Sequence, residues 1–288
     1  GFDRDGALIA LDHDRFGMIV GSGVLDHDVN ELLSSVQSST DAQGRFDLKA
    51  FGENGLPALF PLWLLKYLPN MPACHISVFF DLRGINNTLT TGVSSGLGAV
   101  GEAFRVIERG DADRMLAGGA ESKVNPVGLA QYGIRGVLSR NAEADPKTGY
   151  RPLDERADGL VAGEGAGFLV LEELEHAKKR NARIYAEIAG FGSSSQDGEE
   201  TAMRAALSDA GVDAGAIGHV QASASGIPGE DEREIKALAS VFKGAEKRAF
   251  AGASKSLIGH CGFASGALDL ILSTMVLNER RTDRKSVV

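Results

Sequence analysis

Short apolar runs that begin or end in glycine are the feature that most restricts how this chain can fold. The run 17–23 (GMIVGSG) and the stretch 114–117, which continues into Gly118 and Gly119, have the length and composition of buried strands. The segment 167–174 (GFLVLEEL) has the same character and leads into a basic helical stretch. Because many of the 37 glycines lie at such boundaries, the sequence favours a tightly turned α/β protein.

Between these runs, apolar residues recur at three- and four-residue spacing, which is typical of amphipathic helices. The clearest helix is expected from Ser95 to Gly110, and its apolar face consists of Leu97, Val100, Phe104 and Ile107. Further elements are expected as helices at 199–210, 232–242 and 264–277, and as strands at 183–192 and directly after Cys74. Strands that alternate with helices in this way predict an α/β fold with mixed or parallel sheets packed between helices.

Composition and charge narrow the classes of function. A chain of 288 residues with 43% hydrophobic and 24% charged residues can bury the core of one or two domains. Its net charge is −9 and its pI is near 5.2, whereas proteins that bind nucleic acid or an anionic membrane surface usually carry an excess of basic residues. No apolar run reaches the roughly 18–20 residues of a membrane helix, and two cysteines make no disulfide framework, so we expect a cytoplasmic protein.

Both ends of the chain depart from the pattern of a finished domain. No partner strand is visible before the first apolar run, and residues 282–288 (TDRKSVV) show neither a packing pattern nor a capped element. We therefore expect a fold that is truncated at its start and at its end.

The most informative motif is the segment 151–180 (RPLDERADGLVAGEGAGFLVLEELEHAKKR). Over 151–167 it closely resembles the signature stretch of the β-ketoacyl-acyl-carrier-protein synthases of the fatty-acid type. Gly163, Gly165 and Gly167 let the backbone turn sharply and pack closely before the following strand. A glycine-rich turn of an unrelated α/β protein is the alternative, but the length and order of the match favour the synthase family.

A second stretch, 253–271 (ASKSLIGHCGFASGALDLI), resembles the C-terminal Lys and His block of the same family. The resemblance assigns catalytic positions to Lys255 and His260. In the family this His helps to decarboxylate malonyl-carrier protein, and this Lys holds a charge network with an acidic residue upstream. The alternative for His260 is a core histidine whose hydrogen bonds are satisfied within the fold.

The upstream acidic residues lie in 221–238 (QASASGIPGEDEREIKAL). Pro228, Asp231 and Glu234 match the positions that follow the other catalytic His of the family, so the resemblance carries over Asp231 and Glu234 as site residues. The His itself is absent, and Ser223 stands in its place.

A third stretch, 84–122, matches the family's nucleophile region, and counting back from GEAFRVIERGDAD places the nucleophilic Cys position on Val93. An active member needs a thiol at the N-terminus of the following helix, where the helix dipole and free backbone N–H groups favour the thiolate. The same groups help to stabilise the oxyanion of the acyl thioester. Val93 offers neither a nucleophile nor a hydrogen bond.

Other residues are weaker candidates for the missing nucleophile. Ser94 or Ser95 would need a positioned base, and the His that might supply one is replaced by Ser223. Cys74 and Cys261 are expected to be ordinary packed residues. A zinc site would have to use side chains without CxxC spacing, namely Cys74, His75, His260 and Cys261.

The resemblance implies the thiolase fold, with five αβαβα layers built from two similar halves, here expected at 1–182 and 183–288. It implies no cofactor and no metal. The implied partners are acyl carrier protein with acyl or malonyl thioesters, and a second synthase subunit in a homodimer or heterodimer.

Three functions remain open. The replacements at Val93 and Ser223 favour a non-condensing partner of an active synthase, similar to the chain-length factors of fatty-acid or polyketide synthesis. The second hypothesis is an acyltransferase, either a malonyl-carrier-protein decarboxylase that uses His260 or a diverged 3-oxoacyl-carrier-protein synthase. The third is a module that binds acyl chains or carrier protein without a synthase partner.

Overall fold

The computed structural model describes residues 12–26, 28–141, 145, 148–195, 198–245 and 249–279. The sequence-based expectations for the two ends of the chain, including 282–288, lie outside these residues.

Four strands form the larger sheet, in the order β2-β1-β3-β4. They are β1 (Phe16–Gly21), β2 (Asn86–Leu89), β3 (Arg114–Ser122) and β4 (Glu164–Glu172). Strand β1 runs parallel to β2 and β3, whereas β4 pairs antiparallel with β3 along its whole length. The strands predicted around 17–23, 114–117 and 167–174 are confirmed.

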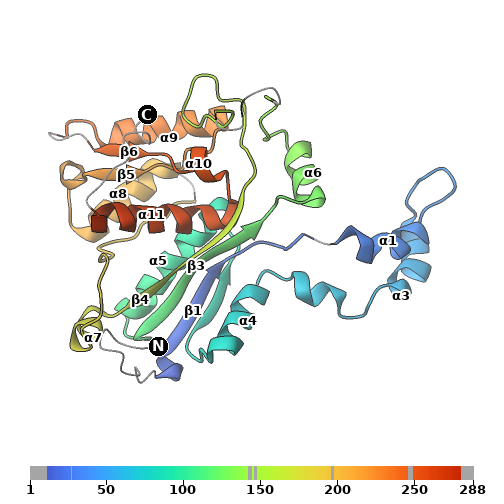
Figure 1. Cartoon of the computed structure of the whole chain (residues 1–288), viewed down its shortest axis with the longest axis horizontal. Coiled ribbons are helices and arrows are strands. Elements are labelled where there is room, and N and C mark those ends of the chain that lie inside the picture. Colours follow the sequence, from blue (N-terminus) through green and yellow to red (C-terminus); the bar gives the residue numbers. More distant parts are fainter. Residues whose placement is uncertain are drawn as a thin grey trace.

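Two helices, α5 (Ser95–Glu108) and α11 (Ser265–Glu279), lie side by side on one face of this sheet (Figure 1). The small residues Ala99 and Ala103 of α5 are fully buried against Ile19 and Met115, so helix and sheet approach closely. The predicted helix from Ser95 and the one near 264–277 are confirmed.

Helix α4 (Met71–Phe80) packs against β1 and β2. The strand predicted after Cys74 is wrong, because this apolar run continues the helix instead. Pro72 at the start of the helix and the left-handed Asp81 at its end set its limits. A short run rich in apolar residues does not by itself distinguish a strand from a helix.

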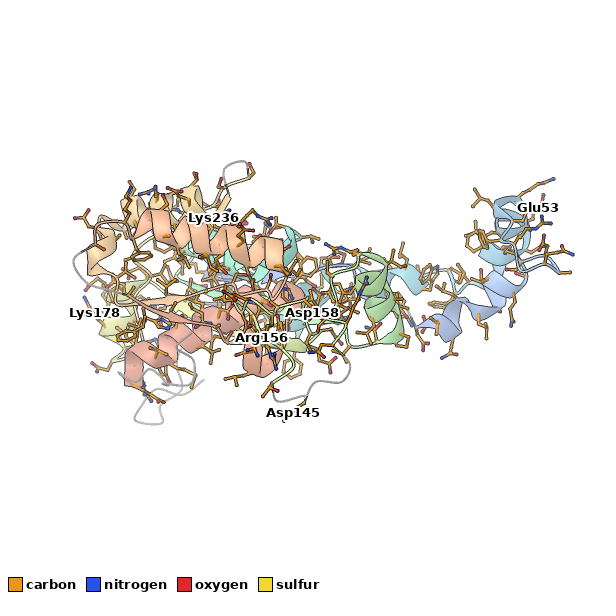
Figure 2. The ribbon with its side chains drawn as sticks, turned by 90° about the horizontal axis from the view of Figure 1, so that it is seen from above. Glu53, Asp145, Arg156, Asp158, Lys178 and Lys236 are labelled. Carbon is orange, nitrogen blue, oxygen red and sulfur yellow. The ribbon has the colours of Figure 1, made fainter. Side chains whose placement is uncertain are left out.

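Between β1 and α4 the chain forms an arm of short helices: α1 (Val29–Gln37), α2 (Leu48–Ala50), a π-turn (Phe51–Gly55), α3 (Leu56–Ala58) and a 3₁₀ turn (Trp63–Tyr67). This arm stands away from the sheet in Figure 1. Seen from above in Figure 2, Glu53 on the arm and Lys178 of α7 (Leu174–Lys179) mark opposite ends of the molecule.

A second, two-stranded parallel sheet consists of β5 (His219–Gln221) and β6 (Phe250–Gly252). Helix α11 also contacts β5, so it lies between the two sheets. Helices α8 (Gly198–Ala210) and α9 (Pro228–Val241) pack on each other in the same part of the molecule, and α6 (Pro126–Ile134) and α10 (Lys255–Ile258) complete the described helices. The helices predicted near 199–210 and 232–242 are confirmed. No described helix is both long enough and apolar enough to cross a membrane.

The strand predicted at 183–192 is wrong: the segment is not part of a sheet. Its apolar alternation is real, and Ile188 packs against the core around Ile19 and Met115. A strand, however, is defined by its hydrogen bonds to a neighbouring strand, and no described strand pairs with this segment. Its far end is held instead by Gly190 and Gly192, where an added Cβ would lie 2.7 Å and 2.3 Å from carbonyl oxygens of α8.

Candidate active site

Val93 lies in a single 3₁₀ turn (Gly92–Ser94) that leads directly into α5. Its side chain is 51% exposed, although it is apolar. Around it, Ser95 Oγ accepts a hydrogen bond from the Thr91 N–H at 2.8 Å and donates to the Gly92 carbonyl at 2.7 Å. The start of α5 is thus well ordered, but position 93 carries no group that can attack a thioester.

Glycines bring this turn close to the loop that follows His260. A Cβ added at Gly21 would lie 2.3 Å from the Gly96 nitrogen, and one added at Gly96 or Gly119 would lie 2.7 Å from the Phe263 carbonyl oxygen. Only backbone fits at these contacts. As a result, the turn at Val93 packs against the 3₁₀ turn Gly262–Ala264.

His260 is 4% exposed and is fixed by the backbone of the signature segment. Its N–H donates to Val161 O at 2.8 Å, and its carbonyl accepts from the Gly163 N–H at 3.0 Å. The Nδ1 atom accepts from the Gly262 N–H at 3.2 Å, which assigns the proton of the neutral ring to Nε2. Burial, assisted by the Lys255 charge, lowers the pKa of His260 to about 4.

Lys255 is 2% exposed, and its ammonium group donates two hydrogen bonds. Nζ donates to the Ser223 carbonyl at 2.5 Å and to Asp269 Oδ2 at 2.8 Å. The other oxygen of Asp269 accepts from Ser254 Oγ and, at 3.3 Å, from Gln221 Nε2. The direct ionic partner of Lys255 is therefore Asp269, downstream in the sequence on α11, and not one of the predicted upstream acids.

Glu234 and Asp231 project from α9 onto the loop that carries Ser223. Glu234 accepts the N–H groups of Ser223 at 2.5 Å and Ala224 at 2.8 Å, and burial raises its pKa. Asp231 is itself buried and accepts from the Gly226 N–H at 3.1 Å. Both carboxylates accept hydrogen bonds from backbone N–H groups. The positive charge of Lys255 also acts on Glu234 and opposes the rise of its pKa.

Asp231 also joins this loop to the signature segment. Its Oδ2 accepts the Leu153 N–H at 2.7 Å, and the neighbouring Tyr150 hydroxyl donates to the Ser225 carbonyl at 2.7 Å. The predicted residues Lys255, Asp231 and Glu234 therefore converge on the loop 223–226, and His260 lies close enough to Lys255 for its charge to act on the ring.

Three contributors were missed by sequence reasoning. Asp269 could have been found from the sequence, because it is an acidic residue within the same Lys and His block, 253–271. In the structure it accepts a hydrogen bond from Lys255. Glu121 accepts the Phe263 N–H at 2.8 Å, and Tyr150 precedes the signature. Neither residue could have been found from the sequence alone. Glu121 is a single acidic residue near the end of a strand, and Tyr150 is a single tyrosine just before the signature segment.

Cys261 is not suited to act as a nucleophile. Its thiol is buried, lies 3.7 Å from the Ile258 carbonyl oxygen, and has its pKa raised by burial. A raised pKa keeps the sulfur in the unreactive thiol form. Cys74 lies on α4.

The family models match nearly the whole chain. The model of the β-ketoacyl synthase N-terminal domain matches residues 3–177, and the model of the C-terminal domain matches residues 185–284. The chain belongs to the β-ketoacyl synthase family.

Curated relatives of this synthase-family chain include the 3-oxoacyl-[acyl-carrier-protein] synthase 2 of Vibrio cholerae, 38% identical over 91% of the chain, and that of Staphylococcus aureus, 31% identical over 93%. The chain spans 63% and 65% of the length of these relatives.

Solved structures give the same result. A β-ketoacyl synthase from Burkholderia phymatum superposes with a TM-score of 0.74 at 32% identity, over 91% of this chain and 62% of that one. The ishigamide ketosynthase/chain length factor gives a TM-score of 0.74 at 27% identity, over 92% and 62%. The thiolase fold expected from the sequence is confirmed.

The buried ion pair gives a first prediction. Replacing Asp269 by Asn should destabilise the protein by about 3–5 kcal/mol, because it leaves the Lys255 ammonium buried without a counter-charge. Urea denaturation measures the change. The control is Glu232→Gln, which breaks the exposed pair with Lys236 on α9 (Figure 2) and should leave the midpoint nearly unchanged. Equal midpoints for both variants would show that Lys255 does not depend on Asp269.

His260 gives a second prediction, on pH. Since its folded pKa lies near 4, below the unfolded value of about 6.5, the folded state resists protonation and stability is lost as pH falls from 6.5 towards 4. The loss attributable to this group is about 3 kcal/mol. Denaturant unfolding at several pH values should show a shallower acid loss in His260→Asn than in the unaltered chain, because every other titrating group is shared. Parallel curves would contradict the buried, neutral assignment.

Proposed function

We propose that this chain is a non-condensing subunit that pairs with an active β-ketoacyl synthase in fatty-acid or polyketide synthesis. The observation that carries the proposal is that Val93 and Ser223 stand at the positions expected for the nucleophile and the first His of the family. Asp231, Glu234 and Lys255 hold the loop at 223–226 through hydrogen bonds to its backbone, and these bonds do not depend on the side chain at 223.

The chemistry of the site supports this role. A condensing enzyme must form an acyl thioester on its own nucleophile, and Val93 has no atom that can do so. A subunit that only shapes or presents the acyl chain needs the fold and the fixed loops, which are the features retained here. A similar fold is found in the ishigamide ketosynthase/chain length factor.

The proposed partners follow from the names of the relatives. The curated relatives act with acyl carrier protein, so we propose an acyl or malonyl thioester of a carrier protein as the ligand and a second synthase chain as the other subunit. We also propose the two halves 1–182 and 183–288 as its structural units. The proposed location is the cytoplasm, which is consistent with the two free thiols.

His260 supports a second candidate, decarboxylation of malonyl-carrier protein. A neutral ring with its proton on Nε2 is a suitable donor to the enolate oxygen that develops when carbon dioxide leaves. Ser223 would have to supply the second hydrogen bond, and as a neutral hydroxyl it is a weak donor for a developing charge.

The third prediction tests the proposed function by incubating the purified protein with acyl- and malonyl-carrier protein, with and without a Cys-containing synthase, and identifying products by mass spectrometry. We expect no elongation by the chain alone, and a changed product length when both proteins are present. Elongation by the chain alone would contradict the proposal. Carbon dioxide release by the chain alone, lost in His260→Asn, would establish the decarboxylase instead.

A further inference from the structure

A buried lysine follows directly after β3 and has no role in the site described above. Lys123 is 9% exposed, and its Nζ donates a hydrogen bond to Asp26 Oδ1 at 2.6 Å. The same Nζ lies 3.6 Å from Glu121 Oε1, and the side chains of both acids are 5% exposed. A buried charge destabilises a protein unless it is paired, so these three side chains form one ionic unit, which we call the Lys123 bridge.

One end of the Lys123 bridge fixes the loop after His260. Glu121 uses its other oxygen, Oε2, to accept the Phe263 N–H at 2.8 Å. A Cβ added at Gly262 would overlap the same oxygen, so the carboxylate lies directly against this turn. The Gly262 N–H in turn donates to His260 Nδ1, and this bond assigns the ring proton to Nε2. The orientation of Glu121 therefore affects which nitrogen of His260 carries the proton.

The charge of Lys123 keeps Glu121 in the ionised form that this contact favours. Burial raises the pKa of Glu121, and the Phe263 N–H and the Lys123 charge oppose the rise. Without the ammonium group, the buried carboxylate of Glu121 would face Asp26 with no positive charge between them. Such a carboxylate takes up a proton or turns away. Either change alters its hold on the Phe263 N–H.

The other end of the Lys123 bridge fixes the segment that leaves β1 and enters the arm. Asp26 lies in this segment, and its Oδ2 accepts a second hydrogen bond, from Asn125 Nδ2 at 2.8 Å. Lys123 also donates to the Val24 carbonyl at 3.4 Å. Two side chains that follow β3 therefore hold the start of the arm.

The same segment is tied to the end of the arm. The Leu25 N–H donates to the Tyr67 carbonyl at 3.1 Å, and the Asp28 N–H donates to the Tyr67 hydroxyl at 3.2 Å. The arm thus leaves and returns at one neck, formed by Leu25, Asp26, Asp28 and Tyr67. Because the arm stands away from the sheet in Figure 1, its position depends on this neck.

We propose that Lys123 is a positioning residue that couples the neck of the arm to the tautomer of His260. A shift of the neck displaces Asp26 and with it the ammonium group, which changes the hold of Glu121 on the turn after His260. The inference goes beyond the proposed function, because it concerns the state of the His260 ring and not the reaction that the ring supports.

The fourth prediction tests the coupling by nitrogen NMR of protein labelled in its histidine rings, at neutral pH, with His260→Asn to assign the signals of His260. In the unaltered chain we expect one protonated and one unprotonated ring nitrogen, with well separated signals. Lys123→Met removes the charge of the bridge, and Asp26→Asn removes only the charge of the neck. In both variants the Gly262 bond is loosened, so the two His260 signals should move towards each other.

A second measurement on the same variants is the alkylation rate of the neighbouring thiol. Cys261 is 1% exposed and lies between His260 and Gly262. In a Cys74→Ala background, both bridge variants should raise its rate by about tenfold or more, because the loop opens more often. The control is Lys178→Met, which breaks the exposed pair with Glu175 on α7 (Figure 2) and should change neither measurement.

A Glu121→Gln background separates positioning from a general loss of structure. The amide of this variant still offers an oxygen to the Phe263 N–H but needs no counter-charge, so Lys123→Met should then move the His260 signals far less than it does alone. If Lys123→Met does not fold by circular dichroism, Asp26→Asn carries the test, because it leaves Lys123 paired with Glu121.

Three results would overturn the coupling. They are unchanged His260 signals in the bridge variants, a shift in Lys123→Met that is absent from Asp26→Asn, and equal shifts for Lys123→Met with and without Glu121→Gln.

Discussion

The structure depends on a backbone contact that only glycine allows. Gly21 at the end of β1, Gly96 in α5 and Gly119 in β3 lie against each other, and Gly96 and Gly119 also lie against the Phe263 carbonyl oxygen. Any side chain there would separate the sheet, α5 and the loop after His260. Because of this contact, the turn at the start of α5 and the loop after His260, which come from distant parts of the sequence, pack side by side.

A buried charge holds the loop at Ser223 in place. Lys255 holds the Ser223 carbonyl and Asp269, and a buried ammonium without such partners would destabilise the fold. The side chains that hold the backbone at position 223 therefore have a structural role that does not depend on the side chain at 223. The expected nucleophile position has no such constraint, since Val93 is half exposed. The proposed loss of the nucleophile is thus physically compatible with a retained scaffold.

The sequence predicted correctly those helices and strands whose periodicity and end signals lie within a single segment. The helix from Ser95 and the glycine-bounded strands were correct because their periodicity and their ends lie in the same segment. The run after Cys74 and the segment 183–192 were misassigned, since a short apolar run is ambiguous and a strand needs a neighbour with which to pair. In the candidate site, the resemblance singled out Lys255 and His260 but not Asp269, whose contact with Lys255 exists only after α11 packs next to it.

We propose that position 93 still has the environment of a nucleophile and lacks only the thiol. The measurement that decides this is the rate of iodoacetamide alkylation of Val93→Cys, in a Cys74→Ala background, as a function of pH. The buried Cys261 serves as the internal reference. The helix N-terminus of α5 should lower the pKa of the new thiol below about 7.5. A thiol that titrates at or above about 8.5 would contradict the claim.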